Sequence, residues 1–367
     1  MKNIFIVFVL FFLICSFGVN CRAIEPDEEY YSALIDSAID SDTGEKLNKI
    51  GINDFTPDEI FNISFSRIGE YFHESIVDKS SEVTSSFSKI LIVLIILITV
   101  KSFLCSDDGK NIKIIGTITI VVLSVDICSN VLEVLLSTMK TSGSFMLSFI
   151  PIYTVILSIG GSVTSGITYN SVAFGFAQLI SIFINNFATD LTGVFLSISV
   201  AFSLNSTINF NRFISGVNKF VSTFIGLLSS GFAAILSVRG VLSVAIDSAT
   251  SKSIKFLIGS LIPIVGSSIS DAYSTVLGSI NVIKGSVAVA GIIIMLVITV
   301  PPILEGVLYC LSFTVLSYIS DMAELNEVSS VIRSFYSALR TIILLNIFQL
   351  FILIVSTAIM ISLKGGS

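Results

Sequence analysis

The chain has 367 residues, of which 53% are hydrophobic and only 13% are charged, and its net charge is −6. Soluble globular proteins carry about 25% charged residues, because polar side chains must cover their surface. This composition therefore excludes an ordinary soluble protein and predicts a lipid environment, and the absence of any basic run argues against binding to nucleic acid.

The first 23 residues have the organisation of an export signal. Lys2 is followed by an apolar run from residue 4 to residue 17, and then by polar residues and Ala23. A positive start, an apolar core and a small residue at the cut site are the three parts of a signal peptide. We predict cleavage after Ala23, with Cys21 as the small residue at −3. An uncleaved anchor is the alternative, and the residues before Cys21 fit a lipoprotein signal poorly.

Residues 24–88 are predicted to form an acidic, partly helical segment outside the cytoplasm. Thr56 is a typical N-cap, Pro57 suits the first helical position, and Glu59 would close a capping box. Apolar residues at helical spacing continue to Phe72 and predict one amphipathic helix. His73 follows, and we expect it to be a surface residue near a helix terminus rather than a catalytic base.

Residues 89–367 are predicted to be an all-α, polytopic transmembrane helix bundle. A membrane helix needs about 20 mainly apolar residues, and the apolar segments of this chain allow about eight to ten spans. The expected spans lie near residues 87–104, 112–139, 144–159, 171–187, 191–205, 220–238, 256–269, 286–300, 303–320 and 341–363.

The membrane region contains an internal similarity. The segment from Ser148 to Ile152, which contains Pro151, recurs 112 residues later around Pro263, and the lysines before the two segments have the same separation. We predict two four-segment repeats, 112–206 and 220–320, with one helix before them and one after. Chance similarity between apolar segments is the alternative. An odd number of crossings in each repeat would make the repeats inverted, as in many transporters.

The basic residues between spans predict the orientation. With residues 24–88 outside, the positive-inside rule places three loops in the cytoplasm. These loops carry Lys101, Lys110 and Lys113, then Arg212 and Lys219, then Arg333 and Arg340. Lys252 and Lys255 would fall outside, against the rule, unless one of the proline segments enters the membrane without crossing it.

Several residues are candidates for a membrane pathway or for packing. Asp126 and Glu133 lie seven residues apart, on one face of the second span, and we expect Asp126 to face the bundle interior. Glu133 and Glu305 are expected at the membrane interface. Pro151, Pro263 and the pair beginning at Pro301 are expected to break helices, and broken helices are tolerated where they line a cavity.

No motif predicts catalysis. The chain has one histidine and five cysteines without a CxxC pair, and it lacks a phosphate-binding loop, a GxSxG motif, an HExxH motif and a dinucleotide fingerprint. We therefore expect no enzyme activity, no cofactor and no metal site, and we interpret the cysteines as small packing residues. Any energy source must belong to a partner.

One stretch of the chain carries a family resemblance. It contains Ser-Val-Arg-Gly-Val at residues 237–241, Asp-Ser-Ala-Thr at residues 247–250, the apolar run of residues 255–266, and Ser-Asp-Ala at residues 270–272. Together with the leader and the acidic segment, these features resemble the stage III sporulation protein AE family of endospore-forming Firmicutes. The resemblance covers essentially the whole chain, is most specific over residues 237–284, and brings no catalytic residues with it.

The resemblance implies a role in sporulation. Members of that family belong to an operon-encoded complex in the mother-cell membrane around the forespore, with other stage III proteins that include a secretion-type ATPase. The complex joins a forespore partner across the intermembrane space, is thought to form a channel or feeding apparatus, and supports late forespore gene expression. The alternative is a stand-alone secondary transporter with two repeats and a site around Asp126, Pro151 and Pro263. A membrane-embedded enzyme is disfavoured by the lack of catalytic clusters.

Overall fold

The computed structural model describes residues 28–103, 108–183, 210–261 and 266–362, and a few positions between 190 and 197. Every regular element in these ranges is a helix, and six helices are long and apolar enough to cross a membrane. The predicted all-α polytopic fold is confirmed.

The helices follow one another in a simple order. The N-terminal elements are α2 (Glu28–Asp36), α3 (Ser41–Lys49) and α4 (Pro57–Phe61). The longer helices are α5 (Phe65–Phe103), α6 (Asp108–Ile159), α10 (Phe210–Leu261), α11 (Gly266–Met322) and α12 (Asn326–Ser362). Between α6 and α10 lies a shorter helical segment with a π-helical turn, made of α7 (Val163–Tyr169), η1 (Asn170–Phe174) and α8 (Gly175–Phe183).

Fewer separate spans are present in the described residues than the eight to ten expected, because proline does not divide the helices. Pro151 lies inside α6, and Pro301 and Pro302 lie inside α11, so the expectation that these prolines break helices is wrong. A proline removes one backbone donor, which a helix of more than 50 residues tolerates when its neighbours hold it in place. The span expected near residues 256–269 is instead the end of α10 and the start of α11. Pro263 and most of the span expected near 191–205 lie outside the described residues.

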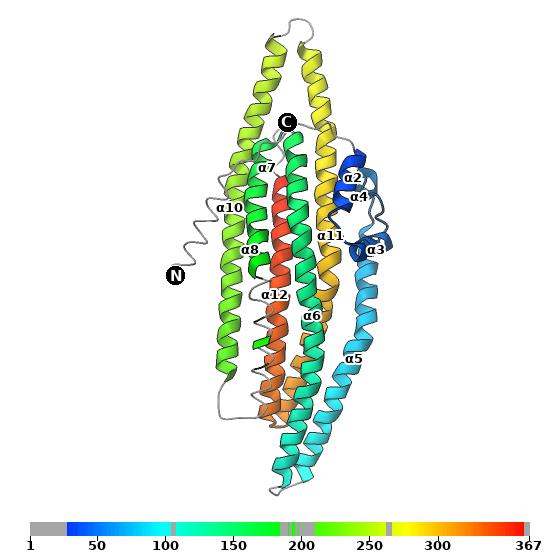
Figure 1. Cartoon of the computed structure of the whole chain (residues 1–367), viewed down its shortest axis with the longest axis vertical. Helices are drawn as coiled ribbons and strands as arrows, with labels where there is room; N and C mark the ends of the chain where they lie inside the picture. The colour runs from blue at the N-terminus through cyan, green and yellow to red at the C-terminus, as the bar shows by residue number, and fades with distance from the viewer. Residues whose placement is uncertain are drawn as a thin grey trace.

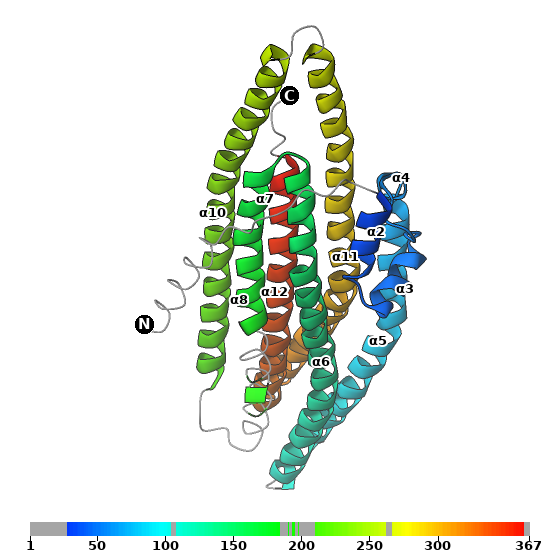
Figure 2. The same ribbon diagram turned by 45° about the horizontal axis from the view of Figure 1, so that its top comes forward.

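The long helices form an antiparallel bundle around α12 (Figure 1). Helix α12 packs against α11, α6 and α10, while α5 lies at the outside against α6 and α11. The ends of α10 and α11 extend beyond the other helices at one end of the bundle, as both views show (Figures 1 and 2). Helix α10 has 52 residues, or about 78 Å of helix, which is far more than a bilayer requires.

The arrangement of the helix ends agrees with the distribution of basic residues. The end of α5 with Lys101, the start of α10 and the start of α12 lie at the same end of the bundle (Figure 1). Lys252, near the end of α10, lies at the opposite end, towards the junction with α11. The three helix ends therefore lie at one end of the bundle, but Arg333 and Arg340 lie inside α12 rather than in the expected loop.

Aromatic side chains pack α6 against its neighbours. Phe145, Phe149 and Tyr153 recur at every fourth residue and are buried, with ring centroids 5.3 and 5.8 Å apart. Tyr153 meets Tyr169 of α7 edge to face at 5.1 Å. Side chains four residues apart lie on one face of a helix, so this row of rings forms a continuous apolar ridge.

Gly291 of α11 is the position where this ridge comes closest to another backbone. A Cβ atom added at Gly291 would lie 2.1 Å from Cζ of Phe149. We expect Gly291→Ala to lower the free energy of unfolding by about 2 kcal/mol or more, because the ring or the helix must move. Thermal unfolding of the detergent-purified protein measures the effect. Gly278→Ala in the same helix is the control, since nothing lies within 4 Å of its Cβ. Equal melting temperatures for the two variants would contradict the prediction.

The N-terminal helices form a small lobe against α11, and α2 also contacts α6. Thr56 caps α4 as predicted, with its hydroxyl accepting the backbone N–H of Glu59, and Pro57 is the first helical residue. The Glu59 carboxylate does not close a capping box, because it accepts the backbone N–H groups of Asn53 and Asp54 instead.

The predicted amphipathic helix is divided in two. Helix α4 ends at Phe61, where the side chain of Asn62 donates to the carbonyl of Asp58, and α5 begins at Phe65. His73 is exposed, as expected, but it lies well inside α5 rather than near a terminus.

Candidate functional site between the membrane helices

The first buried charge in the bundle is Glu305 of α11. The residue is only 7% exposed, and its Oε1 lies 3.4 Å from Nζ of Lys79 on α5. Lys79 also reaches Glu82, one turn further along α5, at 3.4 Å. Glu305 follows Pro301 by about one helical turn, and the missing N–H of that proline leaves the carbonyl of Val297 without its helical partner. A buried carboxylate and a free backbone carbonyl therefore both lie in the part of α11 that contacts Lys79 of α5.

A second polar centre joins three helices. Asp247 of α10 is 8% exposed, and its two carboxylate oxygens accept the backbone N–H groups of Thr164 and Ser165 at 2.9 and 2.8 Å. Lys284 of α11 donates to the hydroxyl of Ser162 at 3.0 Å and is attracted by the charge of Asp247. Asp247 thus supplies, from another helix, the cap that the first turn of α7 needs.

Local sequence explains why α7 is open to this contact. Helix α6 ends at Gly160 and Gly161, where Gly161 has a φ of +74° and Ser162 donates its N–H to the carbonyl of Leu157. This is the Schellman arrangement that glycine favours. Ser162 then makes no side-chain cap of its own for α7. A Cβ at Gly160 would come within 2.7 Å of the Lys284 chain, so the small residue also makes room for that lysine.

Two amides attach α12 to α6. Asn346 donates to the carbonyls of Leu135 at 3.3 Å and Ile342 at 3.1 Å, and Gln349 donates to the carbonyl of Met139 at 3.1 Å. Both amides are fully buried. Side-chain hydrogen bonds of this kind hold membrane helices together where lipid provides no hydrophobic force between them.

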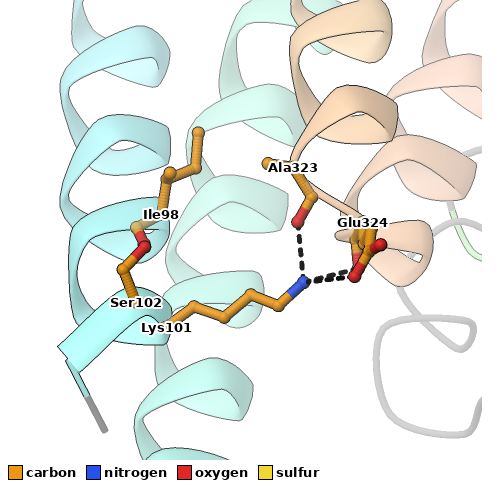
Figure 3. Close-up of polar contacts among 5 residues, drawn as sticks. All are labelled: Ile98, Lys101, Ser102, Ala323 and Glu324. Atoms are coloured by element: carbon orange, nitrogen blue, oxygen red, sulfur yellow. Dashed lines mark hydrogen bonds and ion pairs between the residues drawn. The ribbon is translucent and has the colours of Figure 1, made fainter.

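A third charged contact closes the opposite end of the bundle. Lys101 of α5 donates to the carbonyl of Ala323 at 2.8 Å and lies 3.3 Å from the Glu324 carboxylate (Figure 3). Glu324 has a φ of 55°, and Leu325 donates its N–H to the carbonyl of Ser320, so the turn is another Schellman arrangement. Lys101 satisfies the carbonyls that the end of α11 leaves free.

The residues predicted from sequence are not brought together. Asp126 and Glu133 are both exposed on one face of α6, so the expectation that Asp126 faces the bundle interior is wrong. Pro151 is exposed further along the same helix, and Glu305 is buried rather than at an interface. Exposure depends on which face of α6 its neighbours cover, and the spacing of Asp126 and Glu133 reports only that they share a face.

Sequence reasoning missed the residues that carry most of the buried polar contacts. From sequence, Asp247 is noted only within the stretch that resembles the family, and Lys284, Asn346 and Gln349 are not singled out. Asn346 and Gln349 do have a recognisable signal, because they lie three residues apart, on one face, within an otherwise apolar stretch.

The polar contacts position helices and offer no evident covalent chemistry. In the described ranges, no three His, Cys, Asp or Glu side chains lie close enough together to hold a metal ion. Cys128 is buried and Cys310 is half-buried, and both are free thiols. The arrangement can hold long helices in register and can present charge at defined depths.

Comparison with known proteins supplies the family. A family model described as stage III sporulation protein AE matches residues 51–363, which include all six of the long apolar helices. The stage III sporulation protein AE of Bacillus subtilis (strain 168) is 21% identical over 255 residues, which is 70% of this chain and 63% of that protein. The aligned region thus spans somewhat less than two thirds of the length of that relative. No solved structure matches. The chain belongs to the stage III sporulation protein AE family.

Proposed function

We propose that this chain is a non-enzymatic membrane subunit of a sporulation channel complex that links the mother cell and the forespore. The observation that carries the proposal is the family match, which runs through the whole bundle from residue 51 to residue 363. The proposed location is the mother-cell membrane that surrounds the forespore. The six apolar helices support a multi-pass membrane location.

The proposed partners supply an energy source and a contact with the forespore. They are the other stage III sporulation proteins of the same operon, including a secretion-type ATPase, and a forespore protein across the intermembrane space. In the proposed complex the N-terminal lobe of α2, α3 and α4 faces that space, and the bundle anchors the assembly in lipid. Energy would come from the ATPase, because this sequence has no phosphate-binding loop.

Deletion of the gene in its spore-forming host tests the proposal. We expect sporulation to stop after engulfment, with loss of late forespore gene expression, and an intact copy at another locus to restore both. Fluorescence microscopy of the membranes and a late forespore reporter measure the result. Normal spores from the deletion strain would overturn the proposal.

A stand-alone transporter makes a different prediction. It requires substrate-stimulated uptake into liposomes that contain this protein alone, and such uptake would replace the proposal. The exposed position of Asp126 removes the residue around which an interior transport site was expected.

A further inference from the structure

One face of α6 carries exposed polar residues through the middle of the helix. Its exposed polar residues are Asp126, Asn130, Glu133, Ser137, Lys140, Ser144 and Ser148. Each residue follows the previous one by three or four positions, which places all seven side chains on one side of the helix. From Asp126 to Ser148 this polar face is about 33 Å long.

Contacts with α12 set the depth of the polar face. Asn346 and Gln349 of α12 bond to the carbonyls of Leu135 and Met139, in the middle of the face. These amides belong to the long apolar stretch at the end of α12, which is the part of that helix most suited to lipid. The polar face is therefore level with an apolar section of the central helix.

On the side of the bundle formed by α10, the exposed side chains at this level include large apolar residues. Phe232 of α10 meets Phe351 of α12 with ring centroids 6.5 Å apart, so this part of α10 is level with the middle of the polar face. The outward side chains of α10 here include Leu227, Val238 and Val241, all more than half exposed. Helices α6 and α10 lie on different sides of α12 in both views (Figures 1 and 2). One side of the molecule suits lipid and the other suits water.

A cavity opens on the polar face. It has a volume of about 300 Å³ and is lined on α6 by Lys140, Thr141, Ser144 and Phe145. Its other wall comes from the N-terminal lobe, around Asp40 and Thr43, and from Ile298 of α11. The polar lobe and the polar helix face therefore lie together on one side of the bundle.

Lipid cannot solvate this face. Three of its seven residues are charged, and charged side chains at membrane depth face water or other protein because hydrocarbon offers them no hydrogen bonds. We propose that the α6 face from Asp126 to Ser148 lines a water-filled path, which enters the membrane from the side of the N-terminal lobe and takes hydrated polar solutes. This chain supplies one wall, and the inference rests on the proposed function because the remaining walls belong to the assembled complex.

Cysteine accessibility in the sporulating host tests the inference. In a full-length chain whose five native cysteines are replaced, Asn130→Cys, Ser137→Cys and Ser144→Cys probe the polar face. Leu227→Cys and Val238→Cys are the matched controls on α10. A membrane-impermeant charged maleimide is applied to both sides of the membrane. Because thiolates form in water and not in hydrocarbon, we expect the α6 cysteines to react at least about tenfold faster than the controls.

Two results would overturn the inference. Slow reaction at all the α6 positions would mean that protein or lipid covers this face. Fast reaction at both the α6 and the α10 positions would mean that this level of the bundle lies outside the bilayer. Complete labelling after denaturation checks that each cysteine is present and reduced.

The labelling result and the deletion result are independent. A deletion strain that forms normal spores removes the proposed function whatever the labelling pattern is. A strain that arrests after engulfment, with unreactive α6 cysteines, keeps the sporulation role and removes only the water-filled path.

Discussion

Replacing Asp247 with alanine should lower the free energy of unfolding by about 3 kcal/mol. The carboxylate accepts two backbone N–H groups of α7, and hydrogen bonds to a buried charged group contribute about 1.5–3 kcal/mol each. Its loss also removes the negative charge that attracts the half-buried Lys284. Thermal unfolding of the detergent-purified protein measures the change.

The matched variants separate the cap from the charge. Asp247→Asn keeps one acceptor for α7 and should lose less stability than Asp247→Ala. Combining Asp247→Asn with Lys284→Met removes both charges and should recover part of the loss, because neither partner is then left alone. Asp271→Ala, at an exposed carboxylate on α11, is the control and should change stability little. If the double variant is less stable than the sum of its single changes, the proposed compensation between Asp247 and Lys284 is wrong.

Lys79→Met should lower the free energy of unfolding by about 2 kcal/mol, because it leaves the buried Glu305 carboxylate without its cationic partner. The Glu305 side chain is 8% exposed, whereas that of Lys79 is 45% exposed, so solvent screening makes the pair weaker than a fully buried one. The effect is accordingly set below the about 3–5 kcal/mol typical of breaking a fully buried pair. The same thermal unfolding measurement applies.

Neutralising Glu305 tests whether its unpaired charge causes the loss of stability. Adding Glu305→Gln to Lys79→Met should restore much of the stability, because the buried carboxylate is then neutral. Lys89→Met, at an exposed lysine on the same helix, is the control and should have little effect. Equal melting temperatures for Lys79→Met and Lys89→Met would show that the contact with Glu305 contributes nothing.

The start of α4 could be predicted from the sequence because it depends only on neighbouring residues. Thr56 and Pro57 start α4 as expected, because a cap requires only residues within one turn. The predicted capping box is absent because the Glu59 carboxylate accepts the backbone N–H groups of Asn53 and Asp54 in the preceding loop. Pro151 and Pro301 failed as helix breakers because neighbouring helices and adjacent turns hold the backbone across a single missing bond.

The predicted repeats and the signal peptide remain predictions. The segment around Pro263, on which the repeat depends, lies outside the described residues, as do residues 1–27. The boundaries 24–88 and 89–367 also remain predictions. Helix α5 runs from Phe65 to Phe103 without interruption, so the polar part of the chain continues directly into a long apolar helix.

The sequence by itself determined that this protein is an all-helical membrane protein with an acidic N-terminal segment. These properties follow from composition and from the positions of charges along the chain, which need no knowledge of packing. Only the tertiary structure decided that Glu305 and Asp247 are buried and that Asp126 is exposed. The reason is that burial depends on which face of a helix its neighbours cover. The partners of Asp247 lie 82 and 83 residues away along the chain, beyond the reach of any local pattern.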